Sequence, residues 1–120
     1  MSEEIDVEFE KDVADFYQSL GIHQGPGDLQ YRIILKVLKK NGSDVTNFSE
    51  IRSYTDQFAD RGAIGSKMKT VFQLEGLVNK VKWGGYTITD KGRIASNFLD
   101  ETTEFYKNTK QYRDILDRMP

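Results

Sequence analysis

The 120-residue sequence contains no cysteine and only one histidine, His23. Without cysteine, the chain forms no disulfides, carries no thiol nucleophile and holds no cysteine-ligated zinc. A single histidine also argues against a histidine metal cluster or a histidine acid–base pair. His23 lies in a Gly/Pro loop with no nucleophile beside it in sequence. We therefore expect no metal site, no cofactor and no enzymatic activity.

Long apolar runs are also missing. No stretch of about 18 apolar residues occurs, so we expect no segment to span a membrane. The acidic start of the chain lacks the basic residues and apolar region of a signal peptide. With 38% hydrophobic and 30% charged residues, the composition is that of an ordinary globular protein. We expect a cytoplasmic protein with one domain over residues 1–120 and a core over about 28–96.

Charge is distributed unevenly along the chain, although the formal net charge is only −2. Residues 1–20 hold seven acidic side chains and one basic side chain, whereas residues 61–93 hold seven basic and two acidic ones. A local basic zone is what a phosphate-binding surface requires, whatever the total charge. The alternative is a chance grouping of charges on a solvated surface.

The spacing of apolar residues predicts a mainly α-helical chain with one small β-hairpin. Apolar side chains three or four positions apart indicate helices over residues 3–20, 28–40, 47–58, 62–75 and 90–118. In the first helix the expected inward stripe is Ile5, Phe9, Val13, Phe16 and Leu20. Strands are expected over 77–83 and 86–88, joined by a two-residue Gly84-Gly85 turn.

Polar residues mark the expected helix ends. Asp28 and Thr89 are predicted N-caps. Asn47, followed three residues later by Glu50, is typical of a capping box. Asn41 and Gly42 are predicted to end the second helix, because both residues tolerate a left-handed backbone.

Two phrases near the hairpin resemble winged-helix regulators. Residues 74–78 read LEGLV and residues 86–92 read YTITDKG. The segment 67–96 is similar to the MarR and PadR-like families and to small archaeal winged-helix proteins, although its wing tip is short. The resemblance implies a winged helix-turn-helix fold with an N-terminal helix and a long C-terminal helix. It also implies a regulator of transcription that binds double-stranded DNA.

The helix over residues 62–75 would be the recognition helix of such a fold. Counting 100° per residue from Ile64 places Met68 and Val71 on the inner side. The opposite side is small, polar and basic, which suits contacts to base edges and phosphates in the major groove. The alternative is an ordinary solvated helix face. The predicted DNA-binding residues are Arg61, Ser66, Lys67, Lys69, Thr70 and Gln73, with Lys80 and Lys82 on the wing.

Three further side chains near the hairpin have two interpretations each. Trp83 either covers the core, which we favour, or contacts a sugar. Lys91 and Arg93 either contact phosphates or are ordinary surface charges. The sequence does not decide between these interpretations.

The last helix carries an apolar stripe with alternating spacings of three and four, which is typical of a coiled-coil heptad. A partner's equivalent helix would cover it in a two-fold dimer, which the first helix could join. The alternative is that the stripe packs on the first helix within one chain. The predicted dimer interface is Phe98, Thr102, Phe105, Tyr112, Leu116 and Met119.

A second function remains open from the sequence. Some winged-helix domains dock partner proteins and do not bind DNA, and the sequence pI of 5.4 favours that alternative. The target DNA sequence, the regulated gene and any small-molecule effector are not indicated by the sequence.

Overall fold

The computed structural model describes residues 4–120 and is mainly helical, as the sequence predicts. Its α-helices are α1 (Val7–Ser19), α2 (Leu29–Lys40), α3 (Phe48–Thr55), α4 (Arg61–Lys67), α5 (Asp90–Asn108) and α6 (Lys110–Arg118). A π-helix, η2 (Met68–Gln73), continues α4, and Gly25–Gly27 form a short 3-10 turn, η1. The strands are β1 (Thr46–Asn47), β2 (Val78–Val81) and β3 (Gly85–Ile88).

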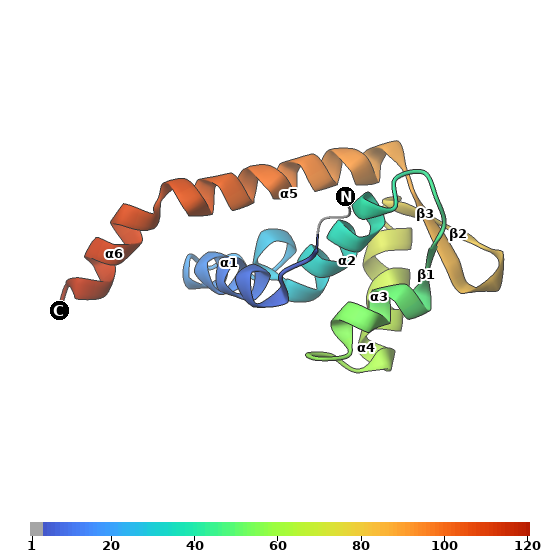
Figure 1. Ribbon diagram of the computed structural model, residues 1–120, viewed down its shortest axis with the longest axis horizontal. Coiled ribbons are helices and arrows are strands. Elements are labelled where there is room, and N and C mark those ends of the chain that lie inside the picture. Colours follow the sequence, from blue (N-terminus) through green and yellow to red (C-terminus); the bar gives the residue numbers. More distant parts are fainter. Residues whose placement is uncertain (1–3) are drawn as a thin grey trace.

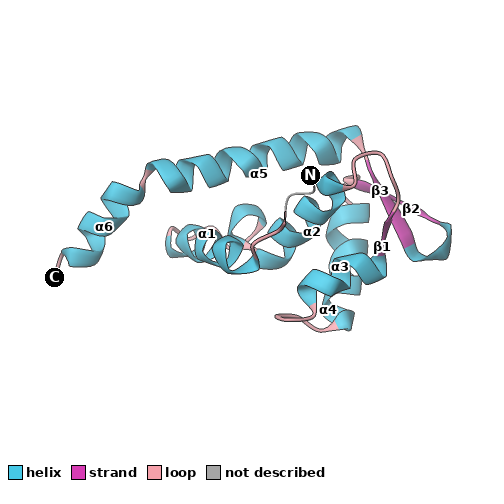
Figure 2. Cartoon of the chain, in the orientation of Figure 1, coloured by secondary structure: helices cyan, strands magenta, loops and turns pink. Residues whose placement is uncertain are grey.

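The molecule is elongated, with extents of 54 × 28 × 26 Å. Helix α5 runs along the long axis, the sheet lies at one end, and α6 lies at the other (Figure 1). The three strands form an antiparallel sheet in the order β1-β3-β2, a small part of a helical chain (Figure 2). The sequence predicted β2 and β3 but not β1, because two residues carry no strand pattern.

Helix α2 is at the centre of the core, and α3, α4–η2, α5 and the sheet pack around it. Its apolar residues Ile33, Ile34, Leu35, Val37 and Leu38 are each at most 1% exposed. At the N-terminal end of α2 the Asp28 side chain accepts a hydrogen bond from the backbone N–H of Gln30, as predicted. Asn41 ends the helix and Gly42 has a positive φ of 58°, also as predicted.

The predicted capping box of α3 is wrong. Asn47 occupies the N-cap position but its side chain caps no backbone N–H, because the residue belongs to β1 and is paired with Gly85. The Glu50 carboxylate instead accepts hydrogen bonds from Asn41 Nδ2, 3.1 Å from each oxygen. The pair therefore ties α3 to the end of α2.

Helix α1 begins at Val7, after the N-cap Asp6. Residue 3, the first residue of the predicted helix, lies outside the described residues. Its buried face is rotated from the predicted apolar stripe. Val13 is buried as expected, but Glu10 and Tyr17 are also buried and Leu20 is 58% exposed. The cause is a buried ion pair between Glu10 and α2, which the apolar pattern cannot indicate.

The recognition-helix candidate changes its winding after Lys67. Ile64 and Met68 are fully buried as predicted, but the next buried position is Phe72 and not Val71, which is half-buried. A π-helix contains more residues per turn than the 3.6 of an α-helix. Counting at 100° per residue therefore assigns Val71, and not Phe72, to the inner side of the helix. Phe72 consequently stacks on Tyr31 of α2, with ring centroids 5.4 Å apart.

The hairpin turn has three residues instead of the predicted two, and it begins two positions earlier than predicted. Val81 pairs with Gly85, so the turn consists of Lys82, Trp83 and Gly84. Trp83 and Gly84 have positive φ angles of 68° and 73°. Gly85 is extended, and a Cβ on it would collide with the Val45 side chain and crowd that of Val81. Gly85 is therefore required by close packing and not by the turn.

The predicted long C-terminal helix is interrupted at Thr109, which separates α5 from α6. Thr89 caps the start of α5 by accepting from the N–H of Gly92, as predicted. After the break, the Arg113 guanidinium lies 3.7 Å from the centroid of the Tyr106 ring and donates to the Tyr106 carbonyl. This contact holds α6 against the end of α5.

Candidate nucleic-acid interface

The outward face of α4–η2 is small, polar and basic, as the sequence predicts. Ser66, Lys69 and Thr70 are exposed there, and Thr70 Oγ1 donates to the Ser66 carbonyl at 2.8 Å. Together with Gly62 and Gly65 these residues line an open depression of about 420 Å³. The glycines lack side chains, so another molecule can approach the backbone of this helix closely.

Two residues predicted for this face are engaged inside the molecule. Lys67 is half-buried and forms an ion pair with Asp28, the residue that caps α2. Gln73 is half-buried, and within residues 4–120 its Oε1 is buried without a hydrogen-bond partner. The widened turn of η2 accounts for the position of Gln73, because it rotates this residue towards the interior.

The basic side chains that remain unpaired are concentrated at this end of the molecule. Within residues 4–120, four of the 17 Lys and Arg side chains form neither an ion pair nor a hydrogen bond and stack on no aromatic ring. Every other basic side chain binds a carboxylate, a carbonyl or a hydroxyl in the chain. The four are Arg61 at the start of α4, Lys69 on η2, Lys80 on β2 and Lys82 in the hairpin turn.

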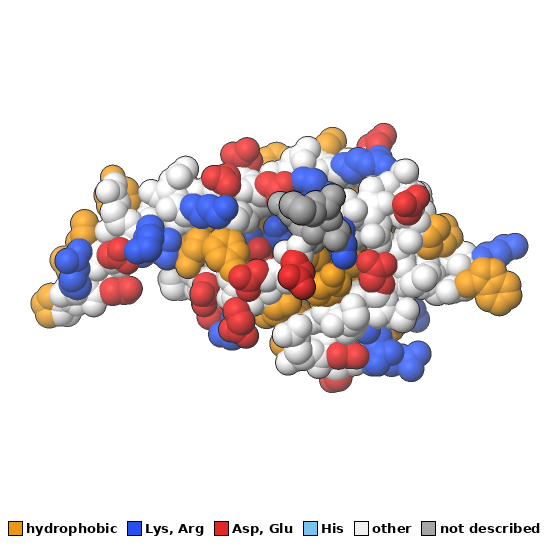
Figure 3. All heavy atoms as spheres, viewed as in Figure 1, with side chains coloured by type: hydrophobic (Ala, Val, Ile, Leu, Met, Phe, Trp, Pro, Cys, Tyr) orange, Lys and Arg blue, Asp and Glu red, His pale blue; other side chains and the backbone are white. Residues whose placement is uncertain are grey.

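The four unpaired bases are distributed from α4 to the β2–β3 hairpin, the segment that the sequence analysis predicted to be the wing. Blue side chains gather over α4 and at the hairpin tip in Figure 3, where they lie beside a hydrophobic group. Lys80 is exposed on β2, but Lys82 belongs to the turn and not to the strand as predicted. The prediction that Trp83 covers the core is wrong, because its side chain is 96% exposed. The turn projects it beyond the sheet.

Lys91 and Arg93 are bound within the chain. Lys91 Nζ donates to the Glu75 carbonyl at 2.6 Å, and Arg93 pairs with Asp90 at 2.8 Å. Thr89 Oγ1 also donates to the Gly76 carbonyl. The bonds of Thr89 and Lys91 tie the start of α5 to the turn after η2, whereas the Arg93–Asp90 pair lies within α5.

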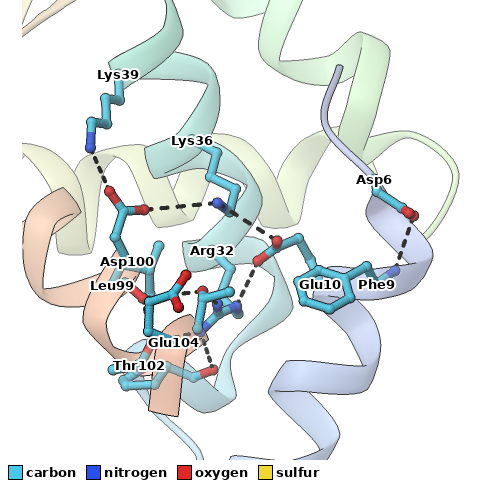
Figure 4. A network of polar contacts seen from close by, with 12 residues as sticks. Asp6, Phe9, Glu10, Arg32, Lys36, Lys39, Leu99, Asp100, Thr102 and Glu104 are labelled. Carbon is cyan, nitrogen blue, oxygen red and sulfur yellow. Dashed lines mark hydrogen bonds and ion pairs between the residues drawn. The ribbon is translucent and has the colours of Figure 1, made fainter. Parts of the chain in front are cut away.

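A buried polar network between α1, α2 and α5 was not predicted from the sequence. Arg32 of α2 is fully buried, and its Nε donates to Glu10 Oε1 of α1 at 2.9 Å (Figure 4). The guanidinium also donates to the Pro26 carbonyl and to the hydroxyls of Thr102 and Thr103 on α5. One arginine therefore binds α1, η1 and α5. An arginine on an otherwise apolar helix face is the only sequence signal of this role.

Surrounding groups extend this network to the surface. Lys36 bridges Glu10 and Asp100 at 3.7 and 4.0 Å, and Lys39 also pairs with Asp100 (Figure 4). Tyr17 donates to the Thr102 carbonyl at 2.6 Å. Burial raises the pKa of Tyr17, so its phenol retains the proton that this hydrogen bond requires. A surface cavity of about 850 Å³ lies beside the network, lined by side chains of both charges.

The predicted dimer residues divide into two groups. Phe98, Phe105, Tyr112, Leu116 and Met119 are each more than half exposed. Thr102 instead contacts Tyr17 and Arg32 within its own chain. The face of α5 that packs on α1 and α2 contains Ser96, Leu99, Thr103 and Tyr106. Phe105 also lies beside Phe16 of α1, with ring centroids 6.4 Å apart, although it is half-exposed.

Residues 4–120 contain neither a group arranged to bind a metal ion nor a helix suited to cross a membrane. No group of three or more His, Asp or Glu side chains there is arranged to hold a metal ion. None of the helices in that part of the chain has the length and apolar character needed to cross a membrane.

No protein-family model matches this chain, and no curated protein or solved structure matches it either.

Proposed function

We propose that this chain is a winged helix-turn-helix protein that binds double-stranded DNA and acts as a non-enzymatic regulator of transcription. The order of elements supports this fold: α3 and α4–η2 correspond to the helix-turn-helix, and the β2–β3 hairpin that follows corresponds to the wing. Helix α4–η2 would enter the major groove, and the wing would contact the adjacent backbone.

The unpaired bases carry this proposal. Nine of the 17 lysines and arginines pair with a carboxylate among the described residues, and four more donate to a carbonyl or a hydroxyl. Arg61, Lys69, Lys80 and Lys82 have no such partner among the described residues, and all four lie on the recognition helix or wing. Phosphates would provide the missing partners, with release of condensed counterions. Exposed Ser66 and Thr70 between the bases suit base-edge contacts.

We extend the proposal to a homodimer formed through α5 and α6. Five large apolar side chains on α5 and α6 are each more than half exposed, and exposed apolar groups of this kind often mark an interface: Phe98, Phe105, Tyr112, Leu116 and Met119. A two-fold dimer would cover these side chains and present two recognition helices to two half-sites on one face of the duplex.

The experiment compares two variants with the same change in net charge. Lys69→Gln with Lys80→Gln removes two of the unpaired bases, and the control, Lys11→Gln with Lys110→Gln, removes two bases paired on exposed helix faces. Binding to a fluorescent duplex is measured by anisotropy across a salt series. We expect the first variant to flatten the slope of log affinity against log salt by about one per lysine, and the control to leave it unchanged.

Two results would contradict the proposal. Equal effects of the two variants would show that total charge matters and that this surface does not. Absence of duplex binding by the wild type at low salt would favour the alternative that the domain docks a partner protein, which agrees with its net charge of −2.

A further inference from the structure

The tip of the β2–β3 hairpin carries an unusual tryptophan. Trp83 is 96% exposed, the highest value among the exposed large hydrophobic residues of the described chain. Within residues 4–120 it makes no aromatic or cation–π contact. An aromatic side chain of this size normally buries most of its surface. Exposure of the whole indole therefore requires an explanation outside the fold.

The backbone of this residue is also unusual. Trp83 is the one non-glycine residue with positive φ in the described chain, at φ 68° and ψ 30°. Such a backbone is strained for a bulky side chain, and turns normally assign it to glycine, asparagine or aspartate. A strained residue that gains no contact in return points to a role in binding.

The surroundings of the indole identify its partner. Lys82 precedes it in the turn and Lys80 lies on β2, and both ammonium groups lack a partner among the described residues. The turn Lys82–Gly84 contains no acidic residue. An apolar group flanked by unpaired cations fits a surface that presents stacked bases between phosphates. Pairing of Val81 with Gly85 holds the turn at its base, so the indole is presented by a fixed hairpin.

We propose that Trp83 is a wedge that enters the minor groove of duplex DNA and inserts between two base pairs. This inference rests on the proposed function and adds a distinct contact to it. Apolar wedges of this kind partly unstack one base step and kink the duplex, and the minor groove offers little sequence information. Lys80 and Lys82 bind the phosphates on either side of the step. The wedge therefore contributes affinity and bending, and α4–η2 contributes base recognition.

The chain offers a direct probe, because Trp83 is its only tryptophan. We expect titration with a mixed-sequence duplex to quench its fluorescence and to protect it from acrylamide. Trp83→Ala is expected to weaken duplex binding about tenfold, as loss of one aromatic–base stack does. Trp83→Phe, which retains an aromatic wedge, should recover most of the affinity. Donor and acceptor dyes on the two duplex ends should approach each other with the wild type and not with Trp83→Ala.

The outcomes separate this inference from the proposed function. Duplex binding that depends on Lys69 while Trp83 remains fully accessible to acrylamide would overturn the wedge and leave DNA binding intact. Loss of affinity without a change in the distance between duplex ends would overturn insertion. No duplex binding by the wild type would remove both proposals. A fluorescence shift with anionic phospholipid vesicles alone would also overturn the wedge, in favour of a membrane surface.

Discussion

At the scale of single residues, the contrast between Arg32 and Lys69 separates structural from functional charge. Arg32 has lost all contact with solvent, and four elements of the chain meet at its guanidinium. Lys69 has an exposed side chain with no partner among residues 4–120. A buried charge is tolerated only when its hydrogen bonds are satisfied, whereas an exposed unpaired charge is available to a ligand.

We predict that Arg32→Met destabilises the protein by about 3–5 kcal/mol, because it leaves the buried Glu10 carboxylate without its main partner. The double variant Glu10→Met with Arg32→Met should recover more than half of this loss, since neither charge then remains buried. Urea unfolding followed by circular dichroism measures both effects.

Arg52→Met is the matched control, because Arg52 forms a partly exposed ion pair with Asp56 within one helix. Its expected cost is at most about 1 kcal/mol. If the Arg32 and Arg52 variants unfold at the same urea concentration, the buried network does not stabilise the fold.

At the scale of elements, η2 shows how winding decides which side chains meet the core. Ile64, Met68 and Phe72 recur at intervals of four and all are fully buried. Every fourth residue stays on the buried side, because a π-helical turn contains more residues than an α-helical turn. The same winding leaves Lys69 and Thr70 exposed and turns Gln73 partly inward. The surface proposed for the major groove is therefore set by the π-helix.

We predict that Phe72→Ala costs about 3–5 kcal/mol of unfolding free energy, because it opens a cavity beside Tyr31. Val71→Ala should cost about 1 kcal/mol, since Val71 is only half-buried. Chemical denaturation of the two variants tests the register of η2. A regular α-helix with Val71 inward would reverse their order.

At the scale of the whole molecule, two surfaces of different character lie towards opposite ends. The unpaired bases and Trp83 lie near the sheet, whereas Tyr112, Leu116 and Met119 lie on α6 at the far end of α5 (Figure 1). Association through α5 and α6 would leave the basic end free. This separation allows one chain to contribute to a dimer and to bind DNA without competition between the two surfaces.

We predict that the wild-type protein sediments as a dimer at ~100 μM, well above the micromolar range of ordinary specific association. Phe98→Glu with Leu116→Glu should give a folded monomer, because both side chains are exposed and the substitutions place charge in the interface. The control, Leu74→Glu, changes an exposed leucine that lies on neither α1, α5 nor α6, and it should remain dimeric. A monomeric wild type at this concentration would refute the dimer.

Features that depend on neighbours along the chain could be predicted from local patterns. Asp28 and Thr89 cap their helices through N–H groups two or three residues away, and Gly42 follows the end of α2. The mainly helical composition and the hairpin follow from local apolar spacing in the same way. These contacts form between residues close in sequence, so a local pattern is enough to predict them.

Features that depend on distant partners follow from the tertiary structure alone. Asn47 joined β1 through its pairing with Gly85, which left Glu50 free to bind Asn41, and Glu10 turned inward to reach Arg32. The tertiary structure also decides which bases remain unpaired, since Lys67 and Asp28 are 39 positions apart. Whether a charged side chain is buried, paired or free depends on which segments the fold brings beside it, and periodicity along one segment carries no information about that.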